Sequence, residues 1–61
     1  MTENEARLMI AESFEAFSGD LHDLAQMLTN RREYAAAKAM RMTALSAADV
    51  ANGQRTKVAA L

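Results

Sequence analysis

The chain has 61 residues, with no cysteine, no proline, two glycines and a formal net charge of −1. A chain this short buries little more than half of its unfolded surface, so it forms one domain with a thin core, and a deep catalytic pocket is excluded. Because disulfides and thiolate metal sites are also excluded, such a domain usually gains stability from self-association or from a partner.

The charges are divided unevenly along the chain. Residues 1–30 contain six acidic residues and one Arg, a balance of −5, whereas residues 31–61 contain six basic and two acidic residues, a balance of +4. This complementarity predicts an acidic helix lying beside a basic one. The acidic start and the short apolar run over residues 8–11 lack the pattern of a signal peptide or a membrane span, so we expect a cytoplasmic protein.

Large apolar residues recur through the first half at alternating spacings of four and three. This periodicity predicts one amphipathic helix from about residue 2 to residue 29. Ser18-Gly19 lies inside this stretch, but the pattern keeps its phase there, so we expect the helix to continue with at most a bend. The two heptad columns consist of Ile10, Phe17 and Leu24 and of Phe14, Leu21 and Leu28.

A short turn is predicted between the two halves. Asn30 and Glu33 have the spacing of a capping box, in which the Asn side chain accepts from a first-turn N–H and the Glu reaches back to the cap. This places the turn at about 29–30 and starts a second helix at about residue 31. Links this short join antiparallel neighbours.

The second half is rich in Ala, the best helix former, which supplies ten of the 31 residues from Arg31 onward. We expect a helix over about 31–52, because Asn52-Gly53 is typical of a C-cap, and the phase of the pattern favours continuation through 54–61. Its two columns of mainly small residues predict tight antiparallel packing. They are Ala37, Ala44, Ala51 and Val58, and Met40, Ala47, Gln54 and Leu61.

The predicted fold is therefore all-α, an antiparallel helical hairpin that pairs into a four-helix bundle as a homodimer. Two helices cannot enclose the large residues on all sides, and full burial of each large side chain contributes about 1.5–3 kcal/mol. The residues expected to mediate self-association are Ile10, Phe14, Phe17, Leu21, Leu24, Leu28, Ala37, Met40, Ala44, Ala47 and Ala51.

No residue pattern predicts catalysis, a cofactor or a metal site. His22 stands between Asp20 and Asp23, but side chains at these spacings do not converge on one point of a helix. Glu12 and Glu15 lie one turn apart, and nothing nearby in the sequence would desolvate either carboxylate, so we expect a solvated face. The chain is not expected to be an enzyme.

Protein recognition is the predicted function. Five methionines in 61 residues can fill a core or form an adaptable binding surface. We expect a small non-catalytic interaction module, a regulator or inhibitor that binds a larger protein, of the kind that phages and mobile elements encode. The residues expected to contact this partner are Tyr34, Met42, Leu45, Met9, Met27, Glu12 and Glu15.

Two alternatives stay open. A dimeric regulator could bind RNA or DNA through a basic patch on the second helix, an architecture similar to that of the plasmid copy-number regulator Rop, although the acidic first helix would repel phosphates. The weaker alternative is an oligomer that sequesters a small ligand between subunits. A membrane-surface helix is not expected, because the polar face of the first helix is acidic. The basic patch consists of Arg31, Arg32, Lys38 and Arg41.

Overall fold

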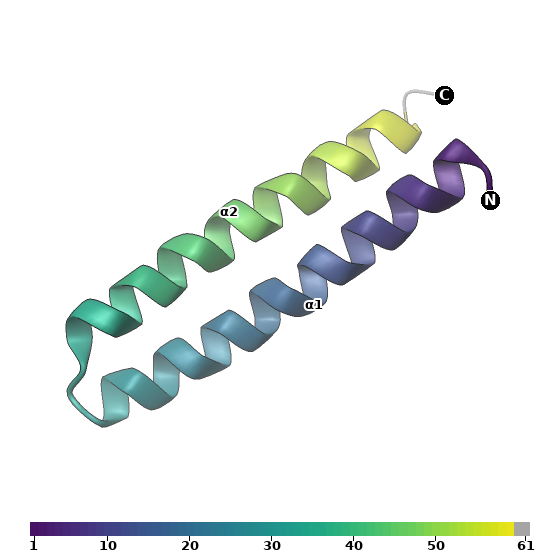
Figure 1. The fold of residues 1–61 in the computed structure, drawn as a ribbon. Helices are drawn as coiled ribbons and strands as arrows, with labels where there is room; N and C mark the ends of the chain where they lie inside the picture. The colour runs from purple at the N-terminus through teal and green to yellow at the C-terminus, as the bar shows by residue number, and fades with distance from the viewer. Residues whose placement is uncertain (60–61) are drawn as a thin grey trace.

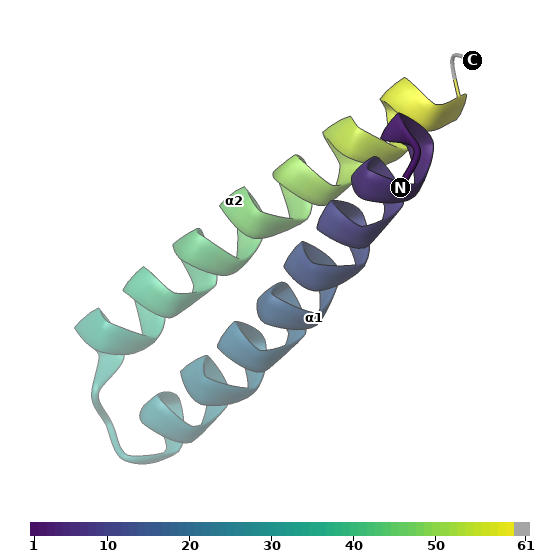
Figure 2. The same ribbon diagram turned by 45° about the vertical axis from the view of Figure 1, so that its right-hand side comes forward.

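The computed structural model describes residues 1–59 as two helices that pack side by side along their whole length (Figures 1 and 2). Helix α1 spans Glu3–Asn30 and helix α2 spans Tyr34–Ala59. The two run in opposite directions, and the Cα envelope measures 45 × 17 × 11 Å. These findings confirm the predicted all-α antiparallel hairpin. Within the described part of the chain, no helix combines the length and the apolar character needed to cross a membrane.

Helix α1 begins with a side-chain cap that the sequence interpretation did not identify. Thr2 occupies the N-cap, and its hydroxyl oxygen accepts from the Glu5 N–H at 3.1 Å while donating to Glu5 Oε1 at 3.1 Å. This Thr-x-x-Glu arrangement is related to the capping box. Glu3 and Glu5 in the first turn also interact favourably with the helix dipole.

The predicted capping box at Asn30 is wrong. Asn30 is the last residue of α1, and its side-chain oxygen accepts from Gln26 Nε2 at 3.0 Å instead of capping a second helix. Helix α2 starts at Tyr34, where the Ala37 N–H donates to the Glu33 carbonyl at 3.0 Å. The turn therefore lies over 31–33 and not at 29–30, and α2 starts three residues later than predicted.

A backbone motif ends α1 in place of the predicted cap. The Glu33 N–H donates to the Leu28 carbonyl at 2.9 Å, and the Arg32 N–H donates to the Thr29 carbonyl at 3.0 Å. These two bonds define a Schellman motif, which satisfies carbonyls that have no partner inside the helix. Arg32 takes the left-handed position of this motif, with φ 63°. Glycine usually occupies that position, so the motif has no obvious sequence signal here.

Helix α2 does not end at the predicted C-cap but continues through Asn52-Gly53 to Ala59. Contacts with α1 hold this last part in place, because Arg7 Nη1 donates to Gln54 Oε1 at 2.9 Å and Arg55 pairs with Glu15. The phase of the apolar residues favoured a helix that continues beyond Gly53, and this continuation is present through Ala59. The predicted column position Leu61 lies outside the described residues.

Small residues fill the contact between the helices. We call this contact the small-residue seam; its members recur every seven residues on each helix and are between 0 and 8% exposed. The Ser18 hydroxyl donates to the Ala44 carbonyl across the seam at 2.9 Å, a distance that requires a close approach of the two backbones. The seam consists of Ala11, Ser18 and Ala25 on α1 and Ala37, Ala44 and Ala51 on α2.

The α1 side of this contact is a column of small residues that the sequence interpretation did not identify, since it assigned the two columns of large residues to self-association. The column of Phe14, Leu21 and Leu28 borders the seam, and only Leu21 is buried. The column that begins at Ile10 lies outside the contact, with all of its members exposed. Small side chains lie in this contact because they allow the two backbones to approach closely enough for the Ser18 hydrogen bond.

Candidate interaction surface

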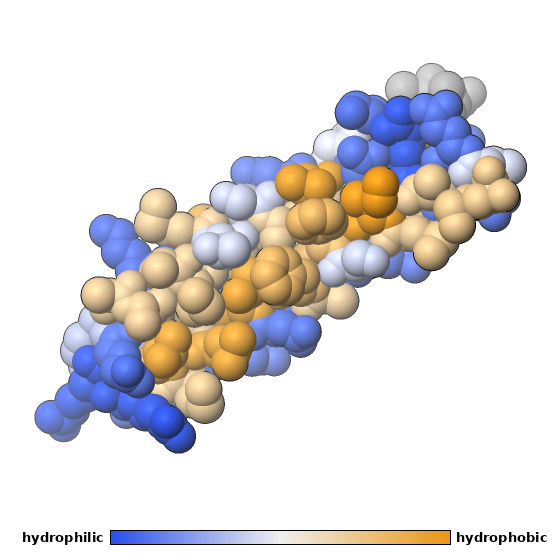
Figure 3. Space-filling view, viewed as in Figure 1, coloured by the Kyte–Doolittle hydropathy of each residue, from blue (hydrophilic) through white to orange (hydrophobic). Residues whose placement is uncertain are grey.

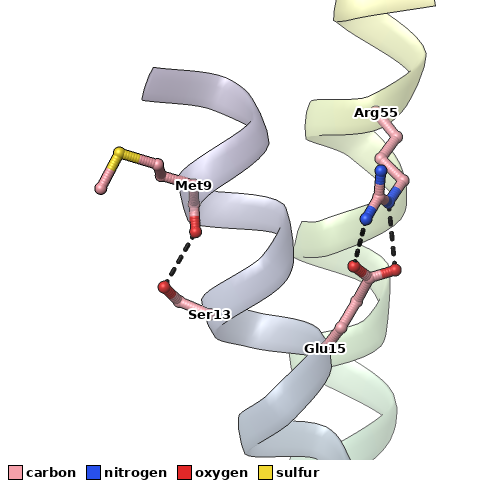
Figure 4. Close-up of polar contacts among 4 residues, drawn as sticks. All are labelled: Met9, Ser13, Glu15 and Arg55. Atoms are coloured by element: carbon pink, nitrogen blue, oxygen red, sulfur yellow. Dashed lines mark hydrogen bonds and ion pairs between the residues drawn. The ribbon is translucent and has the colours of Figure 1, made fainter. Parts of the chain in front are cut away.

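Polar contacts identify one side of the hairpin. Arg55 binds both carboxylate oxygens of Glu15, with Nε at 3.1 Å and Nη2 at 2.5 Å (Figure 4). On the same side, Arg41 Nη1 donates to Thr29 Oγ1 at 3.2 Å. Each of these four residues follows a seam alanine by four positions. In this antiparallel pair, the positions four residues after the seam therefore face each other on the polar side.

The opposite side is apolar. A residue immediately before a seam position is rotated about 100° around the helix, away from the polar side. On α1, large apolar residues take these positions, and an apolar strip runs along the two helices between hydrophilic ends (Figure 3). Five residues, between 36 and 49% exposed, form this surface, which we call the apolar face. They are Ile10, Phe14, Phe17 and Leu24 of α1 and Val50 of α2.

Val50 was not among the predicted site residues, although a signal for it was present in the sequence. It stands directly before Ala51, as Ile10 stands before Ala11 and Leu24 before Ala25. The relation to the column of small residues therefore places Val50 on the same side as the large residues of α1. Hydrophobic periodicity of α2 alone did not separate Val50 from its many apolar neighbours.

A shallow, open depression of about 300 Å³ lies on the apolar face, lined by Ser13, Phe14 and Phe17. The Ser13 hydroxyl donates to the Met9 carbonyl of its own helix at 2.8 Å (Figure 4). Its hydrogen-bonding capacity is thus partly used, and the two aromatic rings supply the rest of the lining. Such a surface suits an apolar side chain of another polypeptide better than a polar ligand.

The Glu15–Arg55 pair also shifts the pKa of both of its members. The hydrogen bond from Arg55 lowers the pKa of Glu15 below its ordinary value, against a smaller opposing effect of desolvation. The same bond raises the pKa of Arg55. Glu15 was predicted to contact a partner protein, but its carboxylate is engaged by α2 of its own chain.

The other predicted partner-binding residues lie on separate surfaces. Tyr34, Met42 and Leu45 of α2 are about 60% exposed, and Met9 and Met27 of α1 are about half exposed. Met42 and Met9 each stand two positions before a seam residue, which rotates their side chains about 200° and points them away from the other helix. The hairpin therefore separates the α1 methionines from the α2 group. Glu12 is exposed on α1.

The residues predicted to mediate self-association divide into two groups. Leu21, Ala37, Ala44, Ala47 and Ala51 are at most 6% exposed and pack between the helices of one chain. Leu28 and Met40 are half-buried beside them. The four exposed members are the α1 residues of the apolar face, and they alone leave substantial surface for a second polypeptide.

The remaining candidates give no enclosed site. Arg31, Arg32 and Lys38 are exposed at the turn end, near the Arg41 that bonds Thr29. His22 is exposed. Among residues 1–59, no group of three or more His, Asp and Glu side chains is arranged to hold a metal ion. In comparisons with known proteins, no family model, no curated protein and no solved structure matches the chain.

Proposed function

We propose that the chain is a small non-catalytic protein-interaction module that works as a homodimer, with two hairpins joined through their apolar faces into a four-helix bundle. One observation supports this most strongly. The large α1 side chains of the apolar face remain 36–49% exposed in the isolated hairpin, although they recur at regular heptad spacing. A regular column of half-exposed Ile, Phe and Leu is typical of a helix that packs against another helix.

The energetics of so short a chain support the same proposal. Within the described residues, no large side chain is fully buried, and the seam consists of alanines and one serine. Alanine burial contributes far less than the about 1.5–3 kcal/mol of a large apolar side chain. Covering the apolar face would supply the burial that a domain of this length usually lacks.

We further propose that the dimer docks on a larger protein as a regulator or inhibitor. Tyr34, Met42 and Leu45 are spaced by eight and three residues, which places them on one side of α2. This side lies outside the apolar face, so the dimer would present it twice. Aromatic and methionine side chains are typical anchors of protein interfaces.

Paired substitutions test the two surfaces separately. Phe17→Glu puts a charge into the apolar face, and light scattering should then find single hairpins at concentrations where the unmodified chain is dimeric. Leu45→Glu is the matched control, because it places the same charge at an exposed apolar position of α2. It should leave the dimer intact and abolish capture of the target protein. Dissociation by Leu45→Glu, or none by Phe17→Glu, would contradict the assignment.

The charge at the turn supports a second candidate, a dimeric nucleic-acid-binding regulator. The turn end, residues 27–41, contains four basic residues and one acidic residue, a net charge of +3, whereas the rest of the chain is acidic. Nucleic acid bound at this end would raise the 260/280 nm absorbance ratio of protein purified at low salt, and a high-salt wash would lower it. A ratio that does not change with salt, together with stoichiometric capture of a protein, favours the interaction module.

A further inference from the structure

We infer that the second copy lies on the apolar face with its turn at the same end as the turn of the first copy, so that α1 of each chain packs on α2 of the other. The inference rests on the proposed homodimer and specifies its geometry. The alternative places the turns at opposite ends and packs α1 on α1 and α2 on α2. The sizes of the side chains and the charges along the helices distinguish these two arrangements of the dimer.

The seam gives the relative heights of the residues on the two helices. The Ser18 hydroxyl reaches the Ala44 carbonyl at 2.9 Å, so these residues lie at the same height. Steps of one heptad then place Ala11 level with Ala51 and Ala25 level with Ala37. A two-fold axis parallel to the helices keeps every residue at its own height, and these levels therefore also apply between the copies.

Side-chain sizes on the apolar side are complementary at these heights. The positions directly before the seam carry large residues on α1, whereas those on α2 carry smaller ones. With both turns at the same end, each layer between the copies contains one large and one smaller side chain, the alternation that fills a core evenly. The layers from the open end to the turn are Ile10 with Val50, Phe17 with Thr43, and Leu24 with Ala36.

The opposite arrangement packs these columns unevenly. It would place Phe17 against Phe17 of the second copy and Ile10 against Leu24, so that large residues meet on one side of the bundle. On the other side Thr43 would meet Thr43 and Ala36 would meet Val50. The α1 side would be overfilled relative to the α2 side, and both overpacking and empty space destabilise a core.

Helix charges favour the same arrangement. Helix α1 carries six acidic residues and one basic residue, a net charge of −5, and α2 carries four basic residues and one acidic residue, a net charge of +3. With the turns at the same end, each α1 lies beside α2 of its own chain and faces α2 of the second copy. The columns continue to Glu3 on α1 and Lys57 on α2, which meet at the open end. The alternative arrangement faces acidic α1 with acidic α1, a juxtaposition that costs association energy.

The broad side of the hairpin, on which the apolar face lies, is comparable in size to one side of a standard protein interface. The broad side of the Cα envelope, 45 × 17 Å, has an area of about 770 Å². Standard protein interfaces bury about 800 Å² on each partner. A second hairpin that covers this side along its length therefore meets the usual requirement without any additional segment.

Distance measurement between two turns tests the arrangement. The chain has no cysteine, so Arg32→Cys at the exposed turn provides a single site for a spin label. Pulsed electron paramagnetic resonance should give a separation below about 30 Å, since packed helices lie 8–10 Å apart. A separation near or above the 45 Å length of the hairpin would overturn the inference while leaving the homodimer in place. Absence of dipolar coupling would instead overturn the homodimer itself.

A second variant tests the packing layers without a label. Ala36→Leu would overfill the layer that already contains Leu24 of the second copy, and it should raise the dissociation constant of the dimer about tenfold or more. Ala35→Leu is the matched control, because Ala35 is exposed one position away, outside the apolar face, and it should change the constant by less than about twofold. If Ala36→Leu lowers the dissociation constant of the dimer or leaves it unchanged, the result would support turns at opposite ends and contradict the inference.

Discussion

The small-residue seam and the apolar face are adjacent columns of the same heptad pattern, but one is closed and the other is open. Seam residues such as Ala11 and Ala44 are inaccessible to solvent, whereas Phe17 and Leu24 on the apolar face remain nearly half exposed. Both columns are regular, so periodicity alone does not decide which one lies between the helices. Side-chain size decides it, since alanine and serine permit the close backbone approach that the large residues would prevent.

The largest effect is expected from enlarging the seam. Ala44→Leu would place a large side chain where the helices touch, and overpacking of this kind typically costs about 1–3 kcal/mol of unfolding free energy. Ala35→Leu adds the same side chain at an exposed position of α2 and should cost little. Urea denaturation monitored by circular dichroism compares the unfolding free energies of the two variants. Equal stability of the two variants would show that the seam is not tightly packed.

Removal of the buried hydroxyl tests the seam more finely. Ser18→Ala deletes the hydrogen bond to the Ala44 carbonyl, and a typical bond of this kind contributes about 0.5–1.5 kcal/mol. Ser46→Ala is the matched control, because the Ser46 hydroxyl is exposed and donates only to the Met42 carbonyl of its own helix. Denaturation midpoints should fall for Ser18→Ala alone. A similar loss in both serine variants would indicate that helix propensity, not the contact between helices, is responsible.

Gly19 belongs to neither column, and its replacement should stabilise the hairpin. A Cβ atom at this position would meet nothing within 4 Å, and the backbone does not take a positive φ. Gly19→Ala should therefore add about 0.5–1 kcal/mol through the helix propensity of alanine. Destabilisation in thermal unfolding would show that α1 needs flexibility at Gly19.

The smallest effect is expected on the polar side, at the Glu15–Arg55 pair. Because the pKa of Glu15 is lowered in the folded chain from its ordinary value of 4.5, the pair stabilises the fold above that pH. This contribution disappears as the pH falls through the lowered pKa, and salt screens it because both side chains are exposed to solvent. Glu15→Gln should flatten this part of the pH dependence of the melting temperature. Glu12→Gln, which leaves the pair in place, should retain it, and an unchanged profile in Glu15→Gln would contradict the assignment.

Periodicity predicts the two helices and their antiparallel pairing, because apolar spacing and short links constrain these features strongly. The α2 side of the seam follows from the alanine column at 37, 44 and 51, which has no competing column of large residues. On α1, the column of Ala11, Ser18 and Ala25 runs beside one of Ile10, Phe17 and Leu24. Hydrophobicity favours the second column, so the sequence interpretation singled out the large residues for self-association and did not identify the small residues of α1 that lie between the helices.

Local capping signals were less informative than the helical period. Asn30 and Glu33 have a capping-box spacing, but backbone bonds around Arg32 close α1 instead. Arginine rarely marks such a position, so this Schellman motif could not be predicted from residue type. The cap formed by Thr2 and Glu5 has a recognisable spacing and was predictable. Isolated four-residue patterns occur by chance too often to locate a turn on their own.

Sedimentation equilibrium of the unmodified chain tests the central claim, that the apolar face is covered by a second copy, most directly. At micromolar concentrations the mass should be twice the 6.7 kDa of one chain, and dilution should release single hairpins that lose helicity. A constant mass of 6.7 kDa over the same range, with cooperative unfolding independent of concentration, would contradict it.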